Sequence, residues 1–130
     1  MRNSRWKTAS SDADFDPYLV GMPQTSVDLF RRFIDLARAC GPVTFELQPR
    51  RIVLCGTRRI FASVQITRAG LRGHLNLARR RTDRRIGKVE PLTKRLHLHR
   101  YTITTTSELD EDFSTWLCEA QTNGDGEQPG

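Results

Sequence analysis

Apolar residues along this chain follow two different periods, and the change between them divides the sequence into elements. Near the N-terminus, Val27, Phe30 and Phe33 recur every three or four positions, and this spacing predicts one face of an amphipathic helix. We expect the helix to end at Gly41-Pro42, because glycine reaches positive φ and proline cannot continue a helix.

From residue 43 to about residue 103 the apolar period becomes two, which is typical of strands with one apolar face. The clearest run is residues 60–67, where apolar and polar positions alternate throughout. Short turns join successive strands, so we expect an antiparallel meander with one covered and one open face. The other predicted strands are residues 43–47, 51–55, 71–77 and 96–103. Residues 79–95 break the pattern and are predicted to form a charged surface loop.

The last predicted strand has an ambiguous facing. Leu96 and Leu98 favour burial on one face, but Arg100 follows them on the same face. The alternate positions share the opposite face: His97, His99, Tyr101 and Ile103. A bulge within this strand would reconcile the two patterns.

A second amphipathic helix is predicted after Ser107, which we expect to cap it, with Asp110 three residues later. Phe113 and Leu117 belong to its apolar stripe. Two helices with apolar stripes and a sheet with one apolar face predict an α+β fold. We expect a two-layer sandwich: an antiparallel sheet of about five strands, covered on one face by the N-terminal and the C-terminal helix.

The length of 130 residues is that of one domain. Residues 1–20 are mostly polar and are predicted to be a disordered N-terminal tail, residues 21–122 the α+β domain, and residues 123–130 a disordered C-terminal tail. The longest unbroken apolar run has four residues, far short of the ~18 that a membrane-spanning helix needs. The N-terminus also lacks the apolar stretch of a signal peptide.

Cysteine usage bears on the cellular compartment. Cys40, Cys55 and Cys118 are odd in number, widely spaced and free of any C-x-x-C pair, which argues against a disulfide framework or a zinc ribbon. We therefore expect buried, reduced thiols in a cytoplasmic protein.

Charge is spread unevenly along the chain. Residues 50–100 carry fifteen Lys or Arg and two acids, a net charge of +13, whereas residues 101–130 carry seven acids and no Lys or Arg. This asymmetry favours an anion-binding surface, or else an acidic C-terminal segment that lies against the basic middle of the same chain. Both alternatives stay open here. The candidate anion-binding residues are Arg72, Arg79, Arg80, Arg81, Arg84, Arg85, Lys88 and Arg100.

Arginine, which outnumbers lysine eighteen to three, binds phosphate bidentately and stacks on bases. If Phe61, His74 and Tyr101 share the open face, their rings would add stacking platforms beside the positive charge. We therefore expect a protein that binds nucleic acid or another polyanion. The alternative is a basic loop that is only solvated.

Histidines supply the one candidate metal site. His97 and His99 lie two positions apart on a predicted strand, so their rings would share a face, and His74 would be the third ligand. Nearby arginines repel a divalent cation, which favours histidines without a metal. No nucleotide-binding, hydrolase or metalloprotease motif is present, so we expect no enzymatic activity and no cofactor. Two other function hypotheses remain. One is a protein–protein interaction module whose acidic last helix and basic loop meet complementary surfaces, such as an acidic protein or a second copy of the chain. The other is a His-based metal-dependent enzyme.

Several short stretches form a pattern together. They are Ala39-Cys40-Gly41-Pro42-Val43, Phe61-Ala62-Ser63-Val64, Arg85-Ile86-Gly87-Lys88-Val89, the His97/His99 strand, and Ser107-Glu108-Leu109-Asp110-Glu111-Asp112 with Trp116-Leu117 and Ala120. Over about residues 25–121 this pattern resembles an uncharacterised bacterial family, the small α+β "predicted transport protein" domain of unknown function. The resemblance implies no established activity, and Gln121 stands where that family typically has an aromatic residue. The transport label finds no support in a sequence without a membrane segment.

Overall fold

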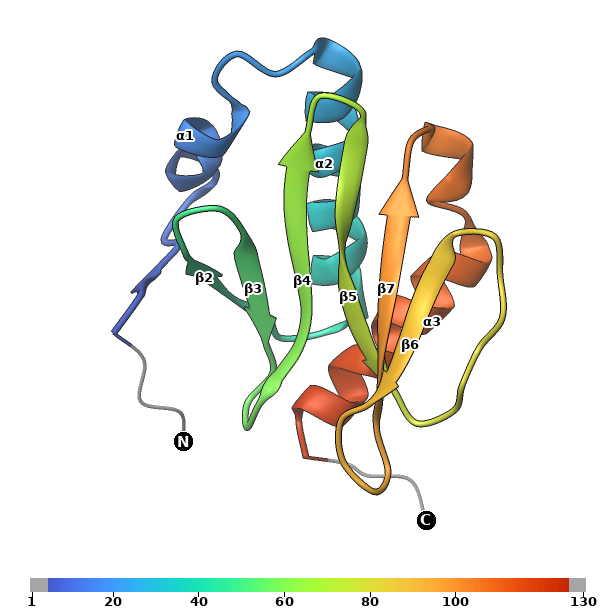
Figure 1. The fold of residues 1–130 in the computed structure, drawn as a ribbon. Helices are drawn as coiled ribbons and strands as arrows, with labels where there is room; N and C mark the ends of the chain where they lie inside the picture. Colours follow the sequence, from blue (N-terminus) through green and yellow to red (C-terminus); the bar gives the residue numbers. More distant parts are fainter. Residues whose placement is uncertain (1–4, 127–130) are drawn as a thin grey trace.

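Seven antiparallel strands form one open sheet in the computed structural model of this protein, which describes residues 5–126 (Figure 1). Their order across the sheet is β1-β2-β3-β4-β5-β7-β6. Their bounds are β1 Lys7–Thr8, β2 Thr44–Leu47, β3 Ile52–Cys55, β4 Ile60–Thr67, β5 Gly70–Leu77, β6 Ile86–Pro91 and β7 His97–Ile103. The α+β prediction is confirmed, and the two strands beyond the expected five are the edge strands β1 and β6.

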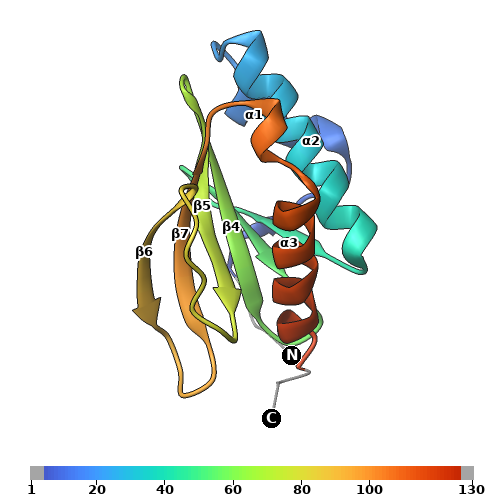
Figure 2. The same cartoon turned by 90° about the vertical axis from the view of Figure 1, so that its right-hand side faces the viewer.

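Two helices, α2 (Gln24–Cys40) and α3 (Glu111–Gly124), pack side by side against the same face of the sheet (Figure 2). Their apolar stripes meet the sheet in an aromatic cluster in which the Tyr101 ring centroid lies 6.1 Å from that of Phe33 and 5.3 Å from that of Phe113. All three rings are buried. The other face of the sheet, toward the viewer in Figure 1, carries no helix among residues 5–126.

The N-terminal segment is part of the fold, which corrects the predicted disordered tail of residues 1–20. Strand β1 pairs with β2 and is followed by a 3-10 turn, η1 (Asp12–Phe15), and a short helix, α1 (Asp16–Leu19). Phe15 is 3% exposed, and its ring centroid lies 5.4 Å from that of Phe30 and 5.4 Å from that of Phe45. One buried aromatic ring therefore anchors a segment that is otherwise polar. Residues 1–4 lie outside the described residues.

The C-terminal boundary also lies later than predicted. Helix α3 continues to Gly124, whose carbonyl oxygen accepts hydrogen bonds from the backbone N–H groups of Arg58 and Arg59. Asp125 accepts a further bond from the N–H of Thr57 at 2.9 Å. Residues 123–126 are thus held by the β3–β4 turn, and the predicted tail beyond them, residues 127–130, lies outside the described residues.

The predicted loop of residues 79–95 contains strand β6, which pairs with β7 at the edge of the sheet. A register shift falls in this pair between Ile86 and Val89. The irregularity therefore lies in β6, and not in the last strand, where we expected a bulge. Strand β7 pairs with β5 without interruption and turns Tyr101 toward the helices. Arg100 therefore faces the open side, where Leu96 is buried outside the main core.

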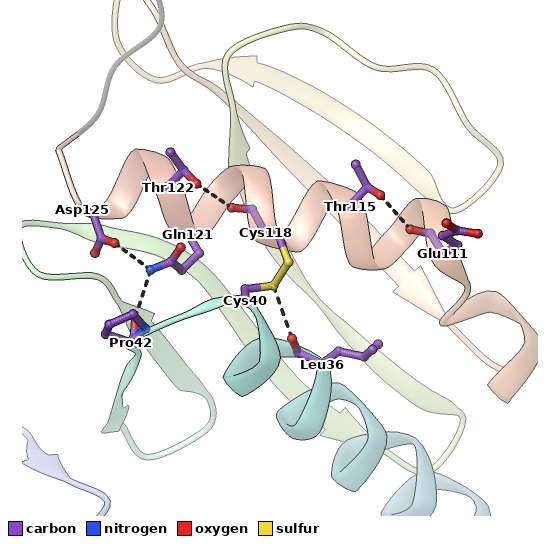
Figure 3. Close-up of a disulfide and its surroundings, with 9 residues drawn as sticks. All are labelled: Leu36, Cys40, Pro42, Glu111, Thr115, Cys118, Gln121, Thr122 and Asp125. Carbon is purple, nitrogen blue, oxygen red and sulfur yellow. Dashed lines mark hydrogen bonds between the residues drawn. A yellow bond between two sulfur atoms is a disulfide. The ribbon is translucent and has the colours of Figure 1, made fainter.

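Cys40 and Cys118 form a disulfide that joins the last residue of α2 to the middle of α3 (Figure 3). The prediction of reduced thiols is wrong for these two residues, because helix packing brings together positions 78 residues apart. Cys55 is buried, as expected. No helix within residues 5–126 is long and apolar enough to cross a membrane. The cytoplasmic location stays a prediction, and disulfides persist mainly in oxidising compartments.

Candidate functional site

The loop between β5 and β6, at the right edge of Figure 1, contains five of the eight predicted anion-binding residues. One of these residues, Arg85, is buried, with 5% of its side chain exposed. Arg85 donates from Nη1 to Asp110 Oδ1 and to the carbonyl oxygen of Glu108, both at 2.7 Å, and from Nε to Asp83 Oδ1 at 2.8 Å. Its guanidinium also lies 4.7 Å from the ring centroid of Trp116. Arg85 therefore belongs to the fold and cannot meet a ligand.

Two more arginines of this loop pair with acids of the C-terminal segment. Arg81 Nη2 donates to Glu119 Oε1 at 2.9 Å, and Arg84 Nη1 donates to Glu108 Oε2 at 3.3 Å. The hydrogen bonds from Arg85 lower the pKa of Asp83 to about 2. These arginines therefore do not form an anion-binding surface. They follow the other alternative, in which the acidic C-terminal segment lies against the basic middle of the same chain and neutralises it. The remaining loop arginines, Arg79 and Arg80, are exposed.

The predicted stacking residues Phe61 and Tyr101 are buried on the face that the helices cover, so neither ring can stack on a base. Phe61 is the extra residue at a register shift where Leu54 pairs with Ala62 and the next residue of β3 pairs with Ile60. This bulge breaks the alternation and turns Phe61 toward α3, where it contacts Gly124. The stacking prediction is therefore wrong for these two rings, and of the three only His74 lies on the open face.

The structure separates the three predicted metal ligands. His97 and His99 face the helix side of β7, whereas His74 faces the open side of β5. Both ring nitrogens of His99 are engaged, because Nε2 accepts from the backbone N–H of Arg81 at 3.0 Å and Nδ1 lies 2.9 Å from the carbonyl oxygen of His97. Within the described residues no three His, Cys, Asp or Glu side chains gather as a metal site.

The open face instead gathers arginines around a hollow of about 380 Å³. Arg72 and Arg100 project from β5 and β7, and Arg51 enters from the residue before β3. All three side chains are exposed. The floor is polar, with Ser63 and His74 paired across β4 and β5 and flanked by Gln65 and Thr102.

A buried hydrogen bond joins the two floor residues. Ser63 Oγ lies 2.7 Å from His74 Nδ1 and also accepts the backbone N–H of His74 at 3.3 Å. Burial, followed by the charges of Arg51 and Arg100, lowers the pKa of His74 to about 4. The imidazole is therefore neutral near pH 7, and one proton lies between Ser63 Oγ and His74 Nδ1. Such a weak base is poorly suited to activate Ser63 as a nucleophile near neutral pH.

A second hollow, of about 460 Å³, adjoins the first and shares Arg51, His74 and Arg100 with it. Arg58 and Arg59, from the turn between β3 and β4, add two more cations to its rim. Its walls are largely aliphatic: Val53, Ile60, Leu92, Leu96 and Leu98. No carboxylate of the described residues lines either hollow, but Arg100, which lines both, donates from Nε to Glu90 Oε1 at 3.2 Å.

Sequence reasoning found Arg72, His74 and Arg100 and missed Arg51, Arg58 and Arg59. A signal for the missed residues existed, since they flank the two strands that precede β5 in the predicted meander. Lys88, the remaining candidate, lies exposed on edge strand β6 with its Nζ 4.0 Å from Glu90 Oε2. It lines neither hollow.

Gln121, the departure from the resembling family, has a structural role here. Its Nε2 donates to the carbonyl oxygen of Pro42 at 3.1 Å and to Asp125 Oδ2 at 2.7 Å, so it ties the end of α3 to the chain after α2 (Figure 3). The family resemblance itself stays a prediction. No model of a known protein family, no curated protein and no solved structure matches this chain.

Proposed function

We propose that this protein is a non-enzymatic module that binds single-stranded nucleic acid by its phosphate backbone on the open face of the sheet. The observation that carries the proposal is the set of five arginines around two adjoining hollows with no carboxylate in the lining of the described residues. They are Arg51, Arg58, Arg59, Arg72 and Arg100. Planar guanidinium groups bind phosphate oxygens bidentately and stay charged at every physiological pH.

The shape of the site supports a single strand rather than a duplex. The two hollows together offer a recessed path across β3, β4, β5 and β7, into which an unpaired strand can settle. RNA-recognition modules likewise bind single strands on the open face of an antiparallel sheet, although this similarity is analogy only. The neutral His74 lines the same hollow as Arg51 and Arg100 and adds a polar ring to its floor.

Salt dependence is the quantitative signature of this proposal. Each phosphate contact on a single strand contributes about −0.7 to the slope of log affinity against log salt. With about three to five contacts, affinity falls roughly 20- to 130-fold between about 50 and about 200 mM salt.

The protein–protein alternative loses the charge pairing that suggested it. Arg81, Arg84 and Arg85 already pair with acids of the C-terminal segment within the chain, so an acidic partner would have to replace these pairs. Binding that hardly changes with salt would favour this alternative.

Fluorescence anisotropy with labelled single-stranded RNA, single-stranded DNA and duplex DNA, each at about 50 and about 200 mM salt, tests the proposal. We expect single strands to bind more tightly than duplex, with a steep loss of affinity at the higher salt. Absence of binding to either single strand at low salt would contradict it.

A further inference from the structure

One buried acceptor in the second hollow has no partner. Asn76, on β5, is 4% exposed and lines this hollow. Its side-chain Nδ2 donates to the backbone carbonyl oxygen of Ile60 at 3.3 Å, and its backbone carbonyl oxygen accepts from Asn123 Nδ2 at 3.2 Å. The side-chain oxygen Oδ1 is buried and accepts no hydrogen bond from any described residue. Buried acceptors are nearly always satisfied, so this oxygen points to a ligand that brings an N–H group.

The surroundings of Asn76 restrict what that ligand can be. Aliphatic side chains form the walls of the hollow, and Leu92 at its lip is half exposed at 47%. A ligand that fills it therefore needs apolar surface as well as an N–H donor. An acyl chain would pack against the aliphatic walls but would leave Asn76 Oδ1 without a hydrogen-bond donor. A flat heterocycle with an amino group on its edge satisfies both.

The rim supplies the remaining feature of a nucleotide. Arg51 and Arg100 line both hollows, so an anionic group bound between them lies beside the aliphatic one. Arg58 and Arg59 also line this hollow. Guanidinium planes stack on bases as aromatic rings do, which compensates for the burial of Phe61 and Tyr101 on the other face.

We infer that the second hollow receives one base of the bound strand, that Asn76 turns its covered Oδ1 toward this base to accept from the exocyclic amino group, and that the phosphate meets Arg51 and Arg100. This inference rests on the proposed function and adds a preference for amino-bearing bases. The first hollow, with its polar floor, continues the path of the backbone past Arg72. The protein then recognises the base at one position of a nucleic-acid strand whose other contacts are electrostatic contacts to phosphate.

The test compares two labelled DNA oligonucleotides of equal length, one of deoxyadenosine and one of purine deoxyriboside, which differs only by lacking the amino group. We expect the native protein to bind the adenine strand about tenfold more tightly, because the purine strand leaves the buried oxygen unpaired. Asn76→Val should bring the two affinities to within about twofold. Both strands are measured on the same protein, so partial unfolding of the variant cancels in the ratio.

Gln65→Leu is the matched control, because Gln65 lies on the open face but lines only the first hollow. It should keep the tenfold preference. Equal affinities for the two strands in the native protein, with steep salt dependence, would overturn the base site and leave backbone binding in place. A preference that survives in Asn76→Val would also overturn it. No binding of either strand at low salt would overturn both the base site and the proposed function.

Discussion

The guanidinium of Arg85 donates to Asp110 Oδ1 at 2.7 Å, and the same oxygen accepts the backbone N–H of Phe113 at 3.0 Å. One carboxylate oxygen thus caps the N-terminus of α3 and neutralises the most deeply buried arginine of the basic loop. The sequence stretch that looks most suited to bind an anion is therefore occupied by the protein's own acids. The hollows on the other side of the sheet are lined by further arginines, of which Arg100 also donates from Nε to Glu90 Oε1 at 3.2 Å.

Arg85→Gln should lower the free energy of unfolding by about 3 kcal/mol, because it leaves Asp83 and Asp110 without their buried partner. Arg80→Gln removes an exposed charge of the same loop and should change stability by no more than about 0.5 kcal/mol. Urea unfolding at neutral pH measures both. Equal stabilities of the two variants would contradict the structural role of Arg85.

Stability should also depend on pH through His74. The pKa of this residue is lowered to about 4 by burial and by the charges of Arg51 and Arg100. An unfolded histidine titrates near 6.5, so between about pH 6.5 and pH 4 the unfolded chain binds a proton that the folded chain does not. The free energy of unfolding should therefore fall as pH drops through this window, by up to about 3 kcal/mol, and His74 should contribute no further change below it.

His74→Gln should reduce this dependence, as measured by urea unfolding at pH 7 and pH 4.5, and the part that remains includes His99, whose pKa burial also lowers. His97→Gln is the control and should keep the native slope. Asp83, whose pKa is about 2, loses its contribution only at lower pH and does not enter this window. A native-like slope in His74→Gln would show that another group controls stability here.

The disulfide between Cys40 and Cys118 closes a loop of 78 residues in the unfolded chain. Loop-closure entropy predicts that Cys40→Ala/Cys118→Ala lowers the free energy of unfolding by about 4 kcal/mol. Adding reductant to the native protein should lower its free energy of unfolding by a similar amount and its thermal midpoint with it. The midpoint of the double variant should stay unchanged. One reactive thiol per chain is expected in denatured, unreduced protein, and three would contradict the disulfide.

The sequence predicted the fold class because helix and strand periods are strong local signals, as Phe30 and Phe33 illustrate on α2. It missed β1 and β6 because edge strands carry weak alternation, and their pairing depends on neighbours distant in the chain. Phe15 was misjudged for a similar reason, since one aromatic ring in a polar segment shows its role only when the core around it is assembled.

The candidate site was predicted in part. Alternation on β5 placed Arg72 and His74 on the open face, and both belong to the hollow there. Phe61 was misplaced by one bulge, and the role of Arg85 depends on Asp110, which lies 25 residues away. Local composition cannot tell a cation that a ligand will meet from one already paired across the fold.

The central claim is that single-stranded nucleic acid binds to the open face of the sheet and not to the arginine-rich loop between β5 and β6. Two variants of equal charge separate these surfaces. Arg51→Gln/Arg72→Gln/Arg100→Gln removes three cations from the hollows, and the control variant removes three exposed arginines that line neither hollow. The control substitutions are Arg79→Gln and Arg80→Gln in the β5–β6 loop and Arg95→Gln in the turn between β6 and β7.

The most direct measurement is the anisotropy of a labelled single strand titrated with the native protein and with each variant at about 50 mM salt. We predict that the open-face variant loses roughly 50-fold or more in affinity and most of the salt slope, since about three phosphate contacts vanish. The control variant should remain within about threefold of the native protein. Equal losses in the two variants would reduce the effect to net charge, and a larger loss in the control would contradict the open-face site.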